Sequence, residues 1–221
     1  DVTLDYADGF IPVDSIWEAI LIERSRAINF TTEFLRDTRD DRIAPTRGSL
    51  LRVSGLYAVE LGKHSTYVLD GEAEWRGYQR LSRQLVAAMA LQGTRTASLR
   101  AGRALPQIYW KEYGGEGSLR GVDRDAIRAA GGGRIGFNAR AELRFQRGLF
   151  GLVAFWDRAQ VWRQTRDIKT VELFKARGMV DGFGVGLRYT FGFPFRLDLA
   201  FNDGFDRNSD KKLYFSIGQA F

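Results

Sequence analysis

Residues 135–145 read Ile-Gly-Phe-Asn-Ala-Arg-Ala-Glu-Leu-Arg-Phe, and their strict alternation decides the fold class. One parity carries the apolar side chains of Ile135, Phe137, Ala139, Ala141, Leu143 and Phe145. The other parity carries Gly136, Asn138, Arg140, Glu142 and Arg144. Successive side chains of a β-strand point to opposite faces, so this period of two predicts a strand with one apolar and one polar face.

The same alternation recurs along the chain. It is clearest near the C-terminus, at residues 183–191, 195–202 and 213–221. Less regular versions occur earlier, at residues 28–34, 51–59, 67–76 and 84–94. Residues 1–16 have no clear assignment. We therefore expect an all-β, antiparallel fold of about nine or ten strands and no helix.

Composition narrows the class of protein. The 221 residues fit one domain spanning 1–221, and the absence of cysteine excludes a disulfide framework. The net charge of +6 comes from basic residues that alternate with apolar ones or lie beside acids, so we do not expect nucleic acid as a partner. No run approaches the roughly twenty apolar residues that a membrane helix needs.

Alternation alone fits either a soluble sandwich or lipocalin-like barrel, or a transmembrane barrel. A soluble barrel turns its apolar face inward, whereas a membrane barrel turns it toward lipid and lines its lumen with polar side chains. The strands are long, aromatic residues lie near strand ends, and the last strand ends on Phe221. These features favour the transmembrane barrel.

One segment between the strands carries a recognisable motif. Residues 105–125 read Leu-Pro-Gln-Ile-Tyr-Trp-Lys-Glu-Tyr-Gly-Gly-Glu-Gly-Ser-Leu-Arg-Gly-Val-Asp-Arg-Asp. Here the pair Gly114-Gly115 precedes the tetrad Leu119-Arg120-Gly121-Val122. The segment resembles the loop of the BamA/TamA-like bacterial surface antigen superfamily, in which Gly-Gly precedes Val/Ile-Arg-Gly-Phe/Tyr. The central Arg-Gly is retained, while both flanking hydrophobic residues depart from the usual types.

Neighbouring segments resemble the same family in order and spacing over residues 30–221. They are a turn at 42–48, and strand motifs at 139–145, 155–162, 182–189, 195–200 and 213–221. The resemblance implies the C-terminal part of a sixteen-stranded barrel with five strands after the loop. In this chain we place those strands at 134–147, 149–163, 178–192, 194–204 and 211–221. We expect further strands and a periplasmic or enzymatic domain upstream of residue 1.

The resemblance also implies a site. The loop would fold back into the barrel, where Arg120 would contact Glu142 and Asp157. Alternation puts Glu142 on a polar face, and Asp157 joins it if Val153 and Phe155 also point inward. A planar guanidinium can bridge carboxylates through several charge-assisted bonds. The alternative is an exposed glycine-rich loop with a solvated arginine.

The C-terminal strand carries Phe215 and Phe221, which share a parity. We expect both to lie in a lipid-facing aromatic girdle. A second, compatible hypothesis is that Phe215 and Phe221 form a C-terminal recognition signal for the barrel-insertion machinery.

The sequence gives little support for an enzyme. His64 is the only histidine and lies in a Gly-Lys-His-Ser turn. No Cys/His cluster offers a metal site, and the glycines at 114–117 lack the Lys-Ser/Thr of a phosphate-binding loop. We expect no catalytic residue, metal or cofactor.

The resemblance implies an outer-membrane barrel that inserts, assembles or translocates proteins. Its partners would be outer-membrane lipid, client outer-membrane or secreted proteins, and upstream periplasmic domains or accessory proteins. Three alternatives remain: an anchor or export barrel for a patatin-like lipase, a passive pore, and a soluble lipocalin-like binder.

Overall fold

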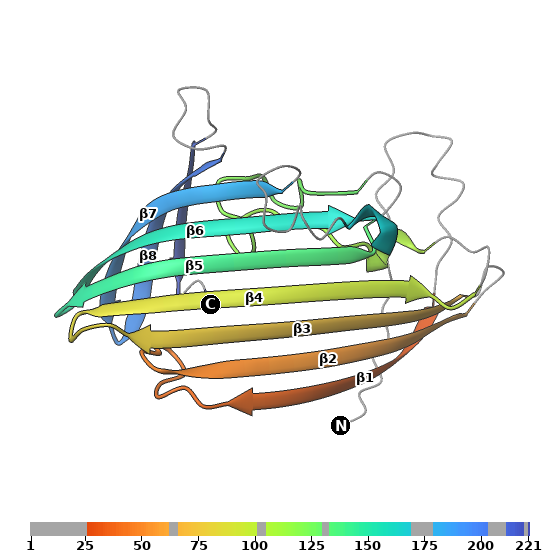
Figure 1. Cartoon of the computed structure of the whole chain (residues 1–221), viewed down its shortest axis with the longest axis horizontal. Helices are drawn as coiled ribbons and strands as arrows, with labels where there is room; N and C mark the ends of the chain where they lie inside the picture. Colours follow the sequence, from red (N-terminus) through yellow and green to blue (C-terminus); the bar gives the residue numbers. More distant parts are fainter. Residues whose placement is uncertain are drawn as a thin grey trace.

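The computed structural model describes residues 26–61, 66–100, 105–129, 133–168, 179–202, 211–218 and 221. They form one antiparallel sheet of nine strands in sequence order (Figure 1). The strands are β1 (Arg26–Asp37), β2 (Gly48–Leu61), β3 (Tyr67–Arg80), β4 (Leu85–Ser98), β5 (Ile135–Arg147), β6 (Phe150–Trp162), β7 (Val180–Phe191), β8 (Phe193–Asn202) and β9 (Lys211–Ile217). Two short 3₁₀ turns, η2 (Gln107–Tyr109) and η3 (Thr165–Asp167), complete the described elements. The all-β antiparallel prediction is confirmed.

Within the described ranges, no helix is long and apolar enough to cross a bilayer. Residues 1–16 and His64 lie outside these ranges.

Alternation located β5 to β8 to within two residues of their observed ends, whereas β1 to β4 extend up to four residues beyond the expected ranges. In β4 the extension reaches Ser98, and Thr96 still points inward there. The last strand is instead shorter than expected, because β9 ends at Ile217 rather than at residue 221. Gly218 follows with a φ of +108°, a left-handed conformation that interrupts the extended backbone.

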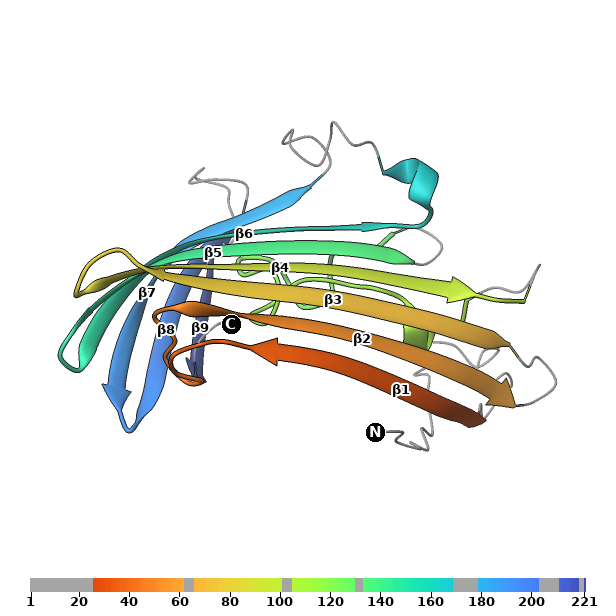
Figure 2. The same ribbon diagram turned by 60° about the horizontal axis from the view of Figure 1, so that its bottom comes forward.

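The sheet curls into part of a barrel (Figure 2), and each strand pairs with its neighbours in the chain. Among the described strands, β1 and β9 each pair on one edge only, so this part of the barrel is open. The connections at one end are mostly short and cover residues 38–47, 81–84, 148–149 and 192. Those at the other end are mostly longer and cover residues 62–66, 99–134, 163–179 and 203–210. Short turns at one end and long loops at the other are typical of outer-membrane barrels.

The distribution of polarity separates the two kinds of barrel. Outward side chains are large and apolar: Phe150 is 69% exposed, Leu187 55% and Phe215 68%. The buried, inward side chains include Arg140, Glu142, Asp157, Arg188 and Asp198. A soluble barrel would show the opposite arrangement, so the faces have the polarity of a transmembrane barrel.

Phe215 and Phe221 lie on opposite sides of the wall. Phe215 points outward from β9, as expected, but Phe221 is only 6% exposed and packs inside against Tyr78, Ala88 and Ala90. The expectation that both residues share a lipid-facing girdle is therefore wrong for Phe221. The strand ends before Phe221, so the parity that relates it to Phe215 in the sequence no longer applies.

Introducing an arginine on the outward face tests whether this face contacts lipid. Val185, in the middle of β7, is 55% exposed on the outward face. We expect Val185→Arg to destabilise the barrel in lipid vesicles by about 2–4 kcal/mol, because its charge would enter hydrocarbon. Ile108→Arg is the matched control, since Ile108 is 62% exposed but lies on the connection between β4 and β5. Equal effects in urea titrations would show that the outward face does not contact lipid.

Candidate functional site

The connection between β4 and β5 folds back along the concave side of the sheet (Figures 1 and 2). We call its described part, residues 105–129, the inner loop. Lys111 anchors it to β3 through an ion pair with Asp70, with 2.7 Å between Nζ and Oδ1. Farther along, three apolar residues of the loop pack on β6 in a buried cluster composed of Tyr113, Leu119, Val122, Ala159 and Val161. Burial raises the pKa of the Tyr113 phenol to about 12, so it stays neutral beside Thr94.

A tight turn presents Arg120 to the wall. Gly114 and Gly115 have φ angles of +137° and +82°, which side chains rarely adopt. The Ser118 hydroxyl accepts a hydrogen bond from the Gly114 amide at 2.9 Å and donates one to the Gly114 carbonyl at 3.0 Å. The Gly115 amide donates to the Val122 carbonyl at 3.1 Å. These bonds close the loop around residues 115–122.

Arg120 is completely buried and makes a two-pronged contact with Asp157 of β6. Its Nε donates to Oδ2 at 2.7 Å, and its Nη2 donates to Oδ1 at 2.8 Å. The Arg120 backbone amide donates to the same Oδ2 at 3.2 Å. This arrangement matches the fork of a guanidinium to the two oxygens of a carboxylate, which fixes the orientation of both groups.

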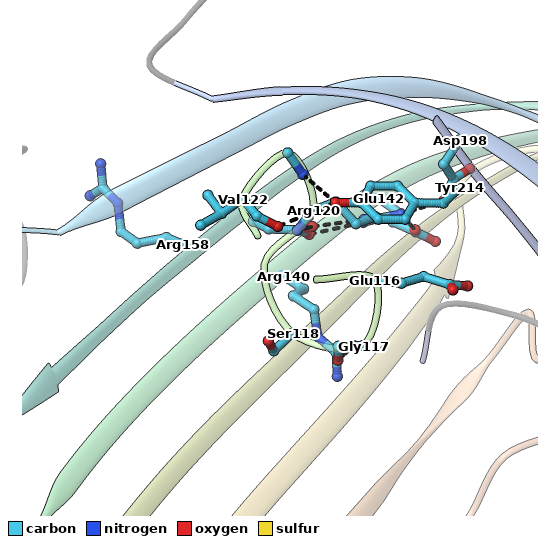
Figure 3. A network of polar contacts seen from close by, with 12 residues as sticks. Glu116, Gly117, Ser118, Arg120, Val122, Arg140, Glu142, Arg158, Asp198 and Tyr214 are labelled. Atoms are coloured by element: carbon cyan, nitrogen blue, oxygen red, sulfur yellow. Dashed lines mark hydrogen bonds and ion pairs between the residues drawn. The ribbon is translucent and has the colours of Figure 1, made fainter. Parts of the chain in front are cut away.

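Two further carboxylates complete the cluster (Figure 3). Nη1 of Arg120 donates to Oε1 of Glu142 at 2.7 Å and to Oδ2 of Asp198 at 3.0 Å. The guanidinium also lies over the Phe155 ring, 3.5 Å from its centroid. Arg120, Glu142, Asp157 and Asp198 form what we call the Arg120 cluster. It joins the inner loop to β5, β6 and β8 at one point.

The structure thus places Arg120 against Glu142 and Asp157, the two acids implied by the family resemblance. Sequence reasoning missed the third acid, Asp198. A signal was present, because Asp198 lies on the polar parity of its strand, between Leu197 and Leu199. Parity gives the face of a residue but not its height along the barrel, so it could not pair Asp198 with the loop.

Additional arginines balance the charge of the cluster. Arg144 donates from Nε to Oε2 of Glu142 at 2.7 Å, and Arg188 forms an ion pair with Asp198. Burial by itself would lower the pKa of Arg120, but the hydrogen bonds and charge of Asp157, together with Glu142 and Asp198, raise it above its ordinary value. Arg120 therefore remains charged. Its three carboxylate partners face three guanidiniums, and this balance limits the cost of removing the charges from water.

Glycines on the inner face of β7 make room for the cluster. A Cβ atom at Gly182 would collide with the Arg120 carbonyl, one at Gly184 with the Phe155 ring, and one at Gly186 with the Asp198 carboxylate. Gly121 of the inner loop has a φ of +90°, and it too leaves no room for a side chain. A Cβ atom there would lie 2.7 Å from the Phe201 carbonyl oxygen of β8. These glycines allow the loop and the wall to approach closely.

The inner loop also contacts the last strand. The Tyr214 hydroxyl of β9 accepts a hydrogen bond from the Gly121 amide at 3.2 Å and donates one to the Val122 carbonyl at 3.4 Å. Lys212 forms an ion pair with Asp123 at 2.6 Å. The segment around Arg120 therefore holds β9 from inside the barrel.

Phe221 lies among arginines of the same wall. Its ring centroid is 4.9 Å from the Arg140 guanidinium and 5.1 Å from that of Arg144. Arg144 also donates to the Phe221 carbonyl at 3.2 Å. Because Arg144 contacts Glu142 as well, Phe221 is linked to the edge of the Arg120 cluster.

Comparison with known proteins agrees with this geometry. A family model described as the Omp85 superfamily domain matches residues 14–221. The chain belongs to the Omp85 superfamily. The resemblance to BamA/TamA-like surface antigens found in the sequence is thereby confirmed. No curated protein matches this Omp85 chain significantly.

A solved structure shares the fold of this Omp85 chain. BamA from Haemophilus ducreyi, in a form lacking POTRA domains 1–3, superposes with a TM-score of 0.69 at 18% sequence identity. The match covers 88% of this chain and 42% of the BamA chain. The present chain thus spans less than half of the protein that it resembles.

Replacing Arg120 tests how much the Arg120 cluster stabilises this Omp85 barrel. Arg120→Ala would leave three buried carboxylates without their shared cation, and we expect a loss of about 3–5 kcal/mol in the free energy of unfolding. Arg128→Ala is the control, because the Arg128 side chain is 60% exposed and its ion pair is with Glu112 of the same loop. Denaturant titration of the folded barrel measures both. Similar losses from the two variants would contradict a special role for Arg120.

Phe221 allows a second test, which separates packing from signalling. Deleting Phe221 should reduce insertion of the protein into the outer membrane in cells if the residue is a recognition signal. Phe221→Leu keeps an apolar group in the pocket but loses the ring beside Arg140 and Arg144. If Phe221→Leu inserts normally and only lowers the stability of the purified barrel, the residue acts by packing. Normal insertion of the deletion variant would rule out the signal.

Proposed function

We propose that this chain is the C-terminal part of an outer-membrane barrel that inserts, assembles or translocates other proteins. The proposal includes further N-terminal strands and a periplasmic domain upstream of residue 1. The short turns would face the periplasm and the long loops the cell exterior. The observation that carries the proposal is the inner loop, which Arg120 holds in the lumen beside the last strand.

The geometry of β9 supplies a mechanism. Its described residues pair with β8 on one edge. In the full barrel the other edge would meet the first strand at a weakly closed seam, where backbone N–H and C=O groups can become available. Such an edge can form hydrogen bonds with an incoming strand of a client protein. Tyr214 and Lys212 bind the inner loop, so the loop would hold this edge in position while the client strand pairs. Arg120 would act as a positioning residue that sets the loop.

Two other functions use the same kind of barrel. An anchor or export barrel for a patatin-like lipase would depend on an enzyme domain upstream. A passive pore would need an open lumen and no client protein. The inner loop occupies part of the concave side and favours the first proposal over a pore.

Reconstitution of the full-length protein tests this function. In phosphatidylcholine vesicles, we expect the protein to accelerate folding of a urea-unfolded outer-membrane barrel, detected by its heat-modifiable gel migration. Arg120→Ala should abolish most of the acceleration, whereas Arg128→Ala should retain it. Conductance without acceleration would indicate a pore, and lipid hydrolysis without acceleration would indicate an anchored lipase. Either result would refute the proposal.

A further inference from the structure

An apolar groove lies on the outward face near the short turns. It has a volume of about 850 Å³ and crosses the ends of β5 to β9. Its lining includes Phe145, Phe150, Leu152, Leu187, Leu197 and Phe215. All six side chains are more than a third exposed, so the groove opens outward rather than into the lumen.

Arg147 lines the turn end of this groove. It has the same parity in β5 as Leu143 and Phe145, so the outward apolar row ends in a cation. Arg147 is exposed at the end of β5. The groove therefore combines a long apolar wall with an exposed guanidinium at one end.

Other arginines continue the positive charge along the short-turn end. Residues 36–47, 80–84 and 146–149 contain seven arginines and three aspartates. We call these three segments the basic rim. Two pairs, Arg39–Asp37 at 2.8 Å and Arg80–Asp40 at 3.8 Å, neutralise part of the charge. An excess of positive charge remains.

The segments of the basic rim are neighbours in space. The Gln146 amide donates to the Gln84 carbonyl at 2.8 Å, which places the turn containing Arg83 beside the end of β5. Arg80 contacts both Thr46 and Asp40, which joins this turn to residues 38–47. The rim is therefore one continuous surface at the turn end of the outward apolar face.

We propose that the groove and the basic rim bind an anionic glycerophospholipid. One acyl chain would lie in the groove, and the headgroup phosphate would accept hydrogen bonds from Arg147 and Arg83. Clusters of arginine at a membrane surface attract anionic headgroups, and a guanidinium can bind a phosphate through two parallel bonds. This inference rests on the membrane placement in the proposed function but not on assembly activity.

Native mass spectrometry of the full-length protein in a nonionic detergent tests the site. Phosphatidylglycerol and phosphatidylcholine with identical acyl chains serve as probes. We expect phosphatidylglycerol to bind roughly tenfold more tightly, and the double variant Arg83→Gln/Arg147→Gln to lose this preference. Arg124→Gln is the control, because the Arg124 side chain is 90% exposed on the inner loop. Equal binding of both lipids, or a preference that survives the double variant, would overturn the proposal.

A substitution in the groove and a competing soluble anion show whether the site binds a whole lipid or only a phosphate group. Leu187→Trp should fill the groove and weaken both lipids, while millimolar inorganic phosphate should not displace phosphatidylglycerol. Full displacement by phosphate would mean a simple anion site and would refute lipid binding. Heat-modifiable migration checks that each variant is folded. A protein that shows the lipid preference but does not accelerate client folding would refute the proposed function alone.

Discussion

One buried guanidinium joins the inner loop to three strands of the described barrel. Arg120 comes from the inner loop, and its three carboxylate partners come from β5, β6 and β8. A buried charge is costly unless it is paired and its hydrogen bonds are satisfied, so these four residues must be positioned together. Arg144 and Arg188 neutralise the excess acid. The position of the loop, the inward polarity of the strands and the glycines of β7 all meet this requirement.

The strands were predictable from the sequence because a two-residue period has one simple physical cause. Residues 135–145 and 183–191 show the period directly, and the observed strands follow it. Alternation did not show which face of the sheet points outward, because it is the same in soluble and membrane barrels. That assignment required the exposure of individual side chains in the structure. Exposure of side chains such as Phe150 and Leu187, together with burial of Asp157 and Arg188, distinguishes the two.

The site was only partly predictable. Glu142 and Asp157 followed from the family resemblance and from parity, but Asp198 lies 78 positions from Arg120 and is paired with it only through the curl of the sheet. The inward position of Phe221 was also missed. A pattern rule extends a strand for as long as the residue types alternate, whereas the backbone at Gly218 leaves the extended conformation. Contacts that depend on curvature or on a single backbone angle are not encoded in local periodicity.

The glycines of β7 show that the inner loop and its wall are matched surfaces. Gly182, Gly184 and Gly186 each leave space for one partner: the Arg120 carbonyl, the Phe155 ring and the Asp198 carboxylate. An engineer who grafted residues 105–129 into another barrel would transfer the arginine but not the space that it needs. The receiving wall would have to gain the three carboxylates and the alternating glycines at the same time. The inner loop and the wall formed by β5 to β8 are therefore one transferable unit, and neither is expected to tolerate exchange without the other.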